Sequence, residues 1–180
     1  MALDIHFSPL CETDFPTLHR WFNEPHVQTL YSLRNWTLTE VEKKLSPYVM
    51  QTVSVRGFVV FSESTPIAYC QYCPIIDYPW PNQDFPDEII ERAAGLDLLM
   101  GEVDYIGKGF GQQIVETFLQ QIIWPSYDYC LVDPDSRNTR SLRLFRKCGF
   151  TLHKVIETTD TLGIPATLQL MIKEKIHQQI

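Results

Sequence analysis

Apolar residues in the first fifty positions repeat first with the spacing of a strand and then with that of helices. Residues 6–10 form a short strand candidate, and Thr13 is a candidate N-cap for the helix that follows. Apolar side chains recur on one side of that predicted helix, at Phe15, Leu18, Trp21 and Phe22. A second helix is predicted from Thr37 or Thr39 toward Tyr48, with acidic residues in its first turn.

The segment between these two helices, residues 23–36, is predicted to be a loop that carries aromatic rings, at His26, Tyr31 and Trp36. Rings in such a loop can line a ligand cleft, although packing is the commoner use of a single ring. Both interpretations of Trp36 stay open on this pattern.

The middle of the chain reads as a β-hairpin followed by a long loop. Residues 53–61 and 66–76 are rich in β-branched and aromatic residues, and the polar residues 62–65 between them predict a turn. Residues 77–88 contain three prolines, which exclude the interior of a regular strand or helix. Loops of this length in compact domains are often functional.

Strands and helices alternate in the second half of the chain. The strands are predicted at residues 96–100, 127–132, 150–157 and 164–172. The helices are predicted at residues 109–123, with Phe110, Ile114, Val115, Phe118, Leu119 and Ile122 toward the core, and at residues 138–148, ending at Gly149. This order indicates a mixed α/β sheet, and the 180 residues suit a single domain over positions 1–180.

Composition narrows the class of protein. Apolar residues make up 44% of the chain and charged residues 21%, which is typical of globular proteins and argues against disorder. Eighteen consecutive apolar residues occur nowhere, and residues 1–10 lack the basic start and apolar run of a signal peptide. We therefore expect a cytoplasmic protein without a membrane segment.

The five cysteines are an odd number without the spacing of a disulfide framework, as expected in a reducing compartment. Cys70 and Cys73 form a CxxC pattern inside a predicted strand. A zinc site would need a second ligand pair, and a redox site would need a strand-to-helix setting. We expect two small apolar residues here and no metal.

The negative charge is concentrated in one segment. The chain has a net charge of −7, and residues 77–104 hold eight acidic residues against one base, Arg92, which accounts for all of it. An acidic surface disfavours nucleic acid and raises the local concentration of a cationic ligand. The alternative is a merely solvated loop.

Three alternate glycines, Gly107, Gly109 and Gly111, precede or open a predicted helix in the sequence IGKGFGQQ. Backbone N–H groups at such a helix start can surround a phosphate, and Lys108 adds positive charge. The segment lacks the Gly-Lys-Ser/Thr of a P-loop and the GxGxxG spacing of a dinucleotide fold. The alternative is a plain loop-to-helix junction.

Two acids stand out on the predicted strands. Asp97 interrupts an apolar strand, where burying an unpaired carboxylate is costly, so it should face a polar cleft or a cationic partner. Asp133 ends the following strand, where ligands commonly lie in α/β sheets. A local hydrogen bond for Asp97 and a turn before Pro134 for Asp133 are the structural alternatives.

The combination resembles a known family. The GKGFG loop that opens a helix, the strand that ends in Asp133-Pro134 and the sequence NTRSLRLFRKCGF over residues 138–150 resemble the acyl-CoA-dependent GNAT N-acetyltransferases. Within them the chain is most similar to the aminoglycoside 6′-N-acetyltransferases, through LHRWFNEPHV, PIAYCQY, GLD and DPDSRN. The resemblance covers nearly the whole chain. It implies the GNAT fold: a mixed, mostly antiparallel sheet of six to seven strands, with strands four and five splayed apart, flanked by about four helices.

The resemblance also implies a site that binds acetyl-CoA between the splayed strands and needs no metal. Its cofactor-binding residues would be Leu98, Leu99, Met100, Gly101, Val103, Gly107, Lys108, Gly109, Phe110, Gly111, Gln112 and Asn138. The acceptor amine would contact Asp97, Asp133 and Trp36, and Asp97 would be the catalytic residue that accepts its proton.

The implied activity is direct acetyl transfer to a primary amine of a small polycation, with an aminoglycoside 6′-amine as the leading acceptor and antibiotic resistance as the outcome. Other acceptors stay open: a protein N-terminus, a lysine or a siderophore precursor. Phe145 departs from the family, because most members carry a tyrosine there whose hydroxyl protonates the leaving thiolate, and a non-catalytic acyl-CoA-binding module is therefore the second class considered. Ile106 departs from many members too, although the aminoglycoside enzymes often carry an aliphatic residue there. We expect a monomer or homodimer, with no nucleic-acid or membrane partner.

Overall fold

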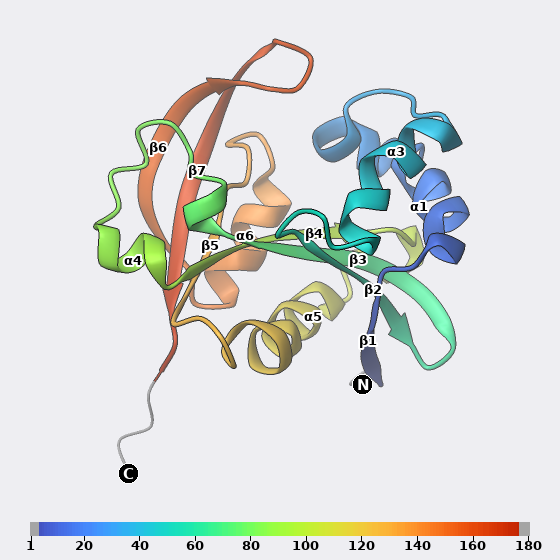
Figure 1. The fold of residues 1–180 in the computed structure, drawn as a ribbon, viewed down its shortest axis with the longest axis horizontal. Helices are drawn as coiled ribbons and strands as arrows, with labels where there is room; N and C mark the ends of the chain where they lie inside the picture. Colours follow the sequence, from blue (N-terminus) through green and yellow to red (C-terminus); the bar gives the residue numbers. More distant parts are fainter. Residues whose placement is uncertain (1–3, 177–180) are drawn as a thin grey trace. The chain divides into compact units, whose positions relative to one another are not determined.

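The computed structural model describes residues 4–176, and its strands form one mixed sheet (Figure 1). The strands are β1 (Ile5–Pro9), β2 (Arg56–Ser62), β3 (Thr65–Pro74), β4 (Ala93–Met100), β5 (Tyr129–Val132), β6 (Thr151–Thr159) and β7 (Pro165–Glu174). They hydrogen-bond in the order β1-β2-β3-β4-β5-β7-β6. Pairing is antiparallel for β1–β2, β2–β3, β5–β7 and β6–β7, and parallel for β4–β5. The predicted mixed, mostly antiparallel sheet is confirmed.

Strands β4 and β5 stay together only briefly, as the resemblance implies for strands four and five. Their parallel register joins Ala93 to Tyr129, Ala94 to Cys130 and Gly95 to Leu131. β4 continues to Met100 beyond this register. The predicted start of this strand at residue 96 was three residues late, because the short ladder to β5 adds Ala93–Gly95.

Six α-helices occur in the described residues, and four of them have eight or more residues. They are α1 (Phe15–Phe22), α2 (Pro25–Val27), α3 (Leu38–Val49), α4 (Asp87–Glu91), α5 (Phe110–Phe118) and α6 (Thr139–Lys147). No helix in residues 4–176 is long and apolar enough to cross a membrane.

The described chain divides into two compact units. One comprises residues 4–72 and 97–114, and the other comprises residues 73–96 and 115–176. Strands β3 and β4 and helix α5 contribute residues to both. The single domain over residues 1–180 stays a prediction.

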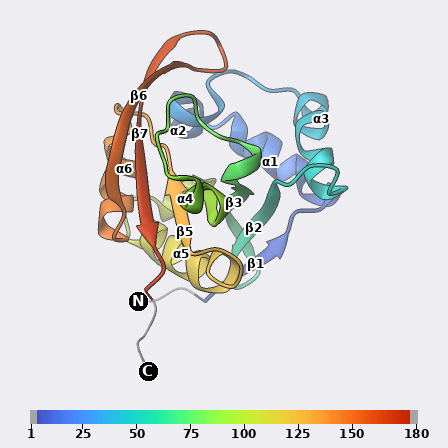
Figure 2. The same ribbon diagram turned by 60° about the vertical axis from the view of Figure 1, so that its left-hand side comes forward.

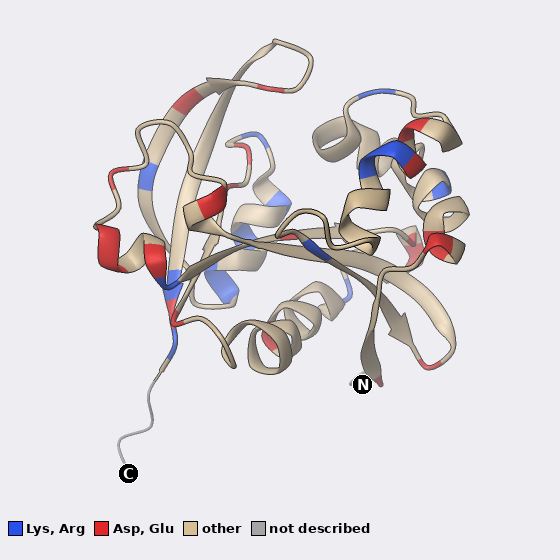
Figure 3. Ribbon diagram, in the orientation of Figure 1, with Lys and Arg blue, Asp and Glu red and all other residues tan. Residues whose placement is uncertain are grey.

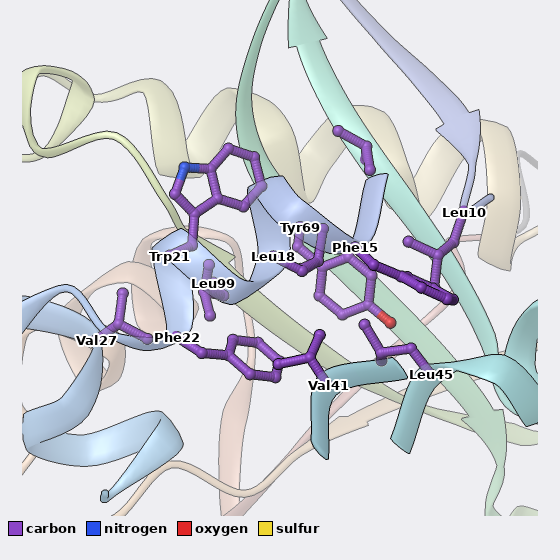
Figure 4. Packing of buried hydrophobic residues seen from close by; sticks show 11 residues of the cluster. Leu10, Phe15, Leu18, Trp21, Phe22, Val27, Val41, Leu45, Tyr69 and Leu99 are labelled. Atoms are coloured by element: carbon purple, nitrogen blue, oxygen red, sulfur yellow. The ribbon is translucent and has the colours of Figure 1, made fainter. Parts of the chain in front are cut away.

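The first unit contains an apolar cluster to which α1 and α3 contribute residues (Figure 4). The four predicted apolar residues of α1, Phe15, Leu18, Trp21 and Phe22, are buried in it. Val41 and Leu45 of α3 point toward the same cluster, where they meet Tyr69 of β3 and Leu99 of β4. The helical period seen in the sequence therefore identified this core correctly.

The starts of α1 and α3 show which residues cap them. At α3, Thr37 is the N-cap: its hydroxyl accepts from Glu40 N at 3.3 Å, while the Glu40 carboxylate accepts from Thr37 N at 2.8 Å. This reciprocal pair satisfies two helix-end donors and decides between Thr37 and Thr39. At α1 the prediction was wrong, since Asp14 occupies the N-cap position and Thr13 lies in a preceding 3₁₀ turn.

The predicted loop over residues 23–36 contains short helical structure. Pro25 occupies the first position of α2, where a missing N–H costs nothing. A single π-helical turn follows over Gln28–Ser32 and ends at Leu33 with φ of 64°. The segment thus contains more helical structure than the predicted loop.

The second unit contains the long β6–β7 pair, which lies side by side in both views (Figures 1 and 2). Its core joins residues from six segments: Ile75, Phe85, Ala93, Leu131, Ile156 and Leu170. Helix α5 continues into this unit and ends in a π-helical turn at Leu119–Ile123. That wider turn changes the helical phase, so Ile123 is buried where Ile122 was predicted. At the other end of α5, Phe110 is the first residue of the helix and is only partly buried.

Candidate functional site

Asp97 lies on β4 in the first unit and is half-buried. Its Oδ2 accepts a hydrogen bond of 2.8 Å from Nε2 of Gln71 on β3. The other end of the same amide, Oε1, accepts a bond of 3.0 Å from the hydroxyl of Tyr69. The carboxylate therefore has a neutral donor, which is the local hydrogen bond that the sequence left as an alternative.

Three ionisable groups that interact electrostatically with Asp97 stay neutral near pH 7. Burial raises the pKa of the Tyr31 and Tyr69 hydroxyls and of the Cys70 thiol, and the charge of Asp97 raises each of them further. These groups cannot compensate the charge of Asp97. The carboxylate keeps a negative potential that suits an ammonium group.

The end of β4 is fixed firmly by helix α1. A Cβ atom at Gly101 would overlap the indole of the fully buried Trp21, so only glycine lets the helix pack this closely. The indole donates to Glu102 at 2.8 Å, and Arg20 forms an ion pair with the same carboxylate. This arrangement sets where the chain leaves β4 toward the glycine loop.

The residues predicted to bind the cofactor at the end of β4 and just beyond it differ in exposure and in their contacts. The side chain of Leu99 is buried in the apolar cluster, so the predicted cofactor contact would have to come from its backbone. The carbonyl of Met100 accepts from Nε2 of His26 at 2.9 Å, a contact that the sequence did not reveal. Leu98 is only partly buried, and Val103 is 62% exposed.

The glycine loop has the conformation that its sequence requires. Gly107 and Gly109 adopt φ of 77° and 85°, and helix α5 begins at Phe110. Their Cβ positions meet open space, so the backbone conformation is what calls for glycine. Gly111 lies inside the helix, and Lys108 is exposed. The first N–H groups of an α-helix have no carbonyl acceptor within it, which makes this end suited to an anion.

Trp36 is a packed ring in the first unit. Its Nε1 donates to the carbonyl of Ser32 at 3.0 Å, Arg34 lies over the ring at 4.0 Å, and Phe22 packs edge-on at 5.5 Å. These contacts agree with the packing interpretation. A contact of Trp36 with the acceptor stays a prediction.

Asp133 lies at the end of β5 in the second unit, where its Oδ2 accepts from Nε1 of Trp80 at 2.8 Å. Burial raises the pKa of Asp133, and the hydrogen bond from Trp80 partly offsets this increase. The loop that carries Trp80 is held to β6, because Gln83 O accepts from His153 and the Phe85 ring stacks on His153 at 3.9 Å. Sequence analysis missed Trp80, although an indole between two prolines in a long loop could have indicated it.

Asn138 and Phe145 belong to helix α6 in the second unit. Asn138 is the N-cap, and its Oδ1 accepts from Ser141 N at 3.1 Å, so its amide nitrogen is the end that could reach a cofactor. Phe145 is buried and packs edge-on against Phe150 with ring centroids 5.4 Å apart. The cofactor contact of Asn138 stays a prediction.

The acidic segment is partly neutralised. Asp84 pairs with Lys154, Glu88 with Arg92 and Glu102 with Arg20, and the remaining acids include Asp87 and Glu91 on α4 (Figure 3). The attraction of this segment for a polycation is therefore weaker than its sequence count indicates. Among the described residues, no three His, Cys, Asp or Glu side chains gather as a metal site would require.

The predicted site residues fall into two groups. Trp36, Asp97 and the segment from Leu98 to Gln112 belong to the first unit, and Asp133 and Asn138 belong to the second. Within the first unit, the candidate base and the glycine loop lie on one short stretch of chain. The residues that sequence analysis missed, Gln71 and Trp80, each donate to one of the two predicted acids.

Comparison with known proteins identifies the family. Residues 11–158 match a family model described as an acetyltransferase (GNAT) domain. Aminoglycoside N(6')-acetyltransferases type 1 from Klebsiella pneumoniae and Serratia marcescens are each 25% identical over 157 residues, covering 84% of this chain and 76% of theirs.

Solved structures share the fold. The aminoglycoside acetyltransferase AAC(6')-Ib in complex with coenzyme A has a TM-score of 0.81 at 23% identity, covering 96% of this chain and 95% of its own. The same enzyme with coenzyme A and kanamycin has a TM-score of 0.80 at 23% identity, with the same coverage. The resemblance predicted from the sequence is confirmed, and the chain belongs to the GNAT acetyltransferase family.

Proposed function

We propose that this protein transfers the acetyl group of acetyl-CoA directly to a primary amine of a small cationic acceptor, the 6′-amine of an aminoglycoside. The observation that carries the proposal is the segment from Asp97 to Gln112, where a carboxylate, a strand and an anion-suited helix start follow one another in one compact unit. The names of the curated relatives support the choice of acceptor.

The first requirement of the reaction is an unprotonated amine. Near pH 7 an alkyl amine carries a proton, which must leave before the nitrogen lone pair can form a bond to carbon. Asp97 would bind the ammonium group and accept this proton, directly or through water. Asp133 would hold a second positive group of the acceptor.

The second requirement is a positioned acyl donor. When bound, acetyl-CoA supplies an activated thioester carbonyl to the amine. Backbone groups of Leu98–Gly101 would hold the pantetheine arm, those of Gly107–Gln112 would hold the pyrophosphate, and Asn138 would contact the cofactor as well. The C–N bond would form and the C–S bond would break, and the second proton lost by the nitrogen as the amide forms would balance the proton taken by the departing thiolate. Phe145 cannot pass that proton to the sulfur, so water would carry it.

The proposal includes a compartment and an acceptor class. We place the reaction in the cytoplasm, since an odd number of cysteines without a framework spacing is typical of a reducing compartment. A cationic acceptor suits the partly neutralised acidic segment. Phe145 favours one competing function, a non-catalytic acyl-CoA-binding module.

The test is thiol release from acetyl-CoA with a panel of aminoglycosides, polyamines and peptides, beside calorimetry with coenzyme A. Asp97→Asn should reduce kcat by at least about 100-fold with little change in affinity for coenzyme A. Glu42→Gln, which removes an exposed acid of α3, is the matched control and should leave both unchanged. Tight binding of coenzyme A with no turnover on any amine would favour the binding module instead.

A further inference from the structure

Gln71 is the side chain whose amide nitrogen contacts the carboxylate of Asp97, and it occupies the neighbouring strand of the same unit. We propose that Gln71 positions Asp97 for proton acceptance and that the buried hydroxyl of Tyr69 fixes the direction of the Gln71 amide. The inference rests on the proposed function, because it concerns the same carboxylate.

The amide is oriented from both ends. Nε2 of Gln71 donates to Asp97 Oδ2 at 2.8 Å, and Oε1 accepts from the Tyr69 hydroxyl at 3.0 Å. If the amide turned over, Oε1 would face a carboxylate oxygen, and two acceptors would oppose each other. The ionised form of Asp97 therefore requires the observed direction.

Tyr69 supports this direction because its hydroxyl is held in place. The residue is fully buried within the apolar cluster, and burial raises its pKa, so it remains a donor well above neutral pH. Space for the hydroxyl comes from Gly57 on β2, where a Cβ atom would lie 2.5 Å from the phenolic oxygen. Tyr69 and Gln71 of β3 and Asp97 of β4 thus form a chain of hydrogen bonds, and Gly57 on the adjacent strand β2 leaves space for it.

A neutral donor suits a carboxylate that must take up a proton. A lysine or arginine at this position would neutralise Asp97 and lower its affinity for both the ammonium group and the proton. An amide orients the carboxylate while leaving its full charge. The titratable groups that interact with the charge of Asp97 are Tyr31 of the π-helical turn Gln28–Ser32 and Tyr69 and Cys70 of β3, and burial keeps them uncharged.

The decisive variants are Gln71→Glu and Gln71→Leu. Gln71→Glu keeps an acceptor for Tyr69 but puts a second carboxylate against Asp97, whereas Gln71→Leu removes both polar ends. Each should lower kcat by about 10-fold or more, as expected for the loss of a hydrogen bond to a charged group. The KM for acetyl-CoA should change less than about 2-fold, since the cofactor segment is untouched. Gln120→Glu, on an exposed position, is the matched control and should match the wild type.

A titration separates positioning from a general folding defect. The ¹³C signal of the Asp97 carboxyl, followed by NMR against pH, should show its midpoint about one unit higher in Gln71→Leu, because the ionised form has lost a donor. The acidic limb of the kcat/KM profile should move by the same amount. Tyr69→Phe, which keeps the buried ring, should produce a smaller shift in the same direction.

The outcomes distinguish this inference from the proposed function. If the wild type acetylates an aminoglycoside and Asp97→Asn abolishes turnover, yet both Gln71 variants keep the wild-type kcat and Asp97 midpoint, the inference is overturned and the function stands. If the wild type releases no thiol with any amine, the proposed function is wrong, and the hydrogen bonds from Tyr69 through Gln71 to Asp97 then have no role in catalysis. Loss of kcat together with the shifted midpoint supports the inference.

Discussion

Trp80 donates its indole N–H to Oδ2 of Asp133 over 2.8 Å, although the two residues are 53 positions apart in the chain. The contact ties the proline-bounded loop before α4 to the end of β5 within one compact unit. Burial disfavours the charged form of Asp133 and raises its pKa, and the indole donor works against this effect. The pair therefore holds an acid in a place where its charge is costly to maintain.

Replacing Trp80 should weaken binding of the acceptor amine. Trp80→Phe keeps an aromatic ring but removes the donor, so the pKa of Asp133 should rise further and its charge should be less available. We expect the KM for an aminoglycoside to increase about 3- to 10-fold, the effect of one hydrogen bond, with kcat nearly unchanged. Steady-state kinetics at pH 6 and pH 8 measure this, and the increase should be larger at pH 6. An unchanged acceptor KM at both pH values would show that the pair does not serve the acceptor.

Two glycines should respond to alanine for different reasons. Gly101→Ala places a methyl group against the Trp21 indole, and this overpacking should lower the free energy of unfolding by about 1–3 kcal/mol. Gly109→Ala meets open space, but its φ of 85° should cost about 1–2 kcal/mol and disturb the helix start.

Denaturant unfolding and kinetics separate the two glycine variants. Only Gly109→Ala should raise the KM for acetyl-CoA strongly relative to its loss of stability. Equal increases in this KM for both variants would argue against a cofactor role for the glycine loop. Gly163→Ala, which also has a positive φ of 76° and open space but lies in the β6–β7 turn, is the control for backbone strain alone.

Glu102 should make the protein more stable above its titration range than below it. Hydrogen bonding from Arg20 holds the pKa of Glu102 below its ordinary value, and Trp21 contributes a second bond. Because the folded-state pKa is lowered, the stabilisation is present above the unfolded-state value near 4.5 and is lost as pH falls through the folded-state value.

Glu102→Gln tests the charge alone, because its amide oxygen still accepts from Trp21. We expect a loss of about 0.5–1 kcal/mol at pH 7 and a smaller loss at pH 3, since Arg20 is half-exposed and its ion pair is screened. Glu102→Ala should cost about 1–3 kcal/mol more at either pH, because the Trp21 N–H loses its partner. A Glu102→Gln difference that is the same at pH 3 and pH 7 would contradict the electrostatic explanation.

Local patterns in the sequence predicted the elements whose stability is local. The apolar face of α1 follows from residues three or four positions apart, and Thr37 was one of the two N-cap candidates for α3. The glycine loop before α5 was predicted too, although the positive φ of Gly107 and Gly109 was not. The start of β4 was missed, because it depends on a ladder to β5 more than thirty residues away.

The polar partners of the candidate acids could not be found from one sequence. Gln71 and Asp97 are 26 positions apart, and only the pairing of neighbouring strands brings them together. The π-helical turn at Leu119–Ile123 could not be predicted from the sequence either, since positions 122 and 123 are both isoleucine and either could be the buried one. Strand register and side-chain packing determine contacts of this kind, and the spacing of apolar residues along the chain predicts neither.

Phe145 occupies the position at which most GNAT acetyltransferases carry a tyrosine, and restoring that tyrosine tests whether the hydroxyl is needed. The ring is 6% exposed and packs edge-on against Phe150, so it serves the core of the second unit. We expect Phe145→Tyr to change kcat by less than about 3-fold. The reason is that a thiol is a far stronger acid than an alcohol, with a cysteine side chain near pKa 8.5, so a thiolate leaves readily without an acid catalyst and the attack of the amine limits the rate.

The measurement is kcat between pH 6 and pH 8, beside thermal unfolding, for Phe145→Tyr and for Phe145→Leu as the packing control. Phe145→Leu should lose stability without losing kcat per folded molecule, because the ring supplies packing and no proton. An increase in kcat of about 10-fold or more for Phe145→Tyr would show that protonation of the thiolate limits the wild-type enzyme. In that case water would be a poor substitute for the missing hydroxyl, and the expectation that attack of the amine limits the rate would be wrong.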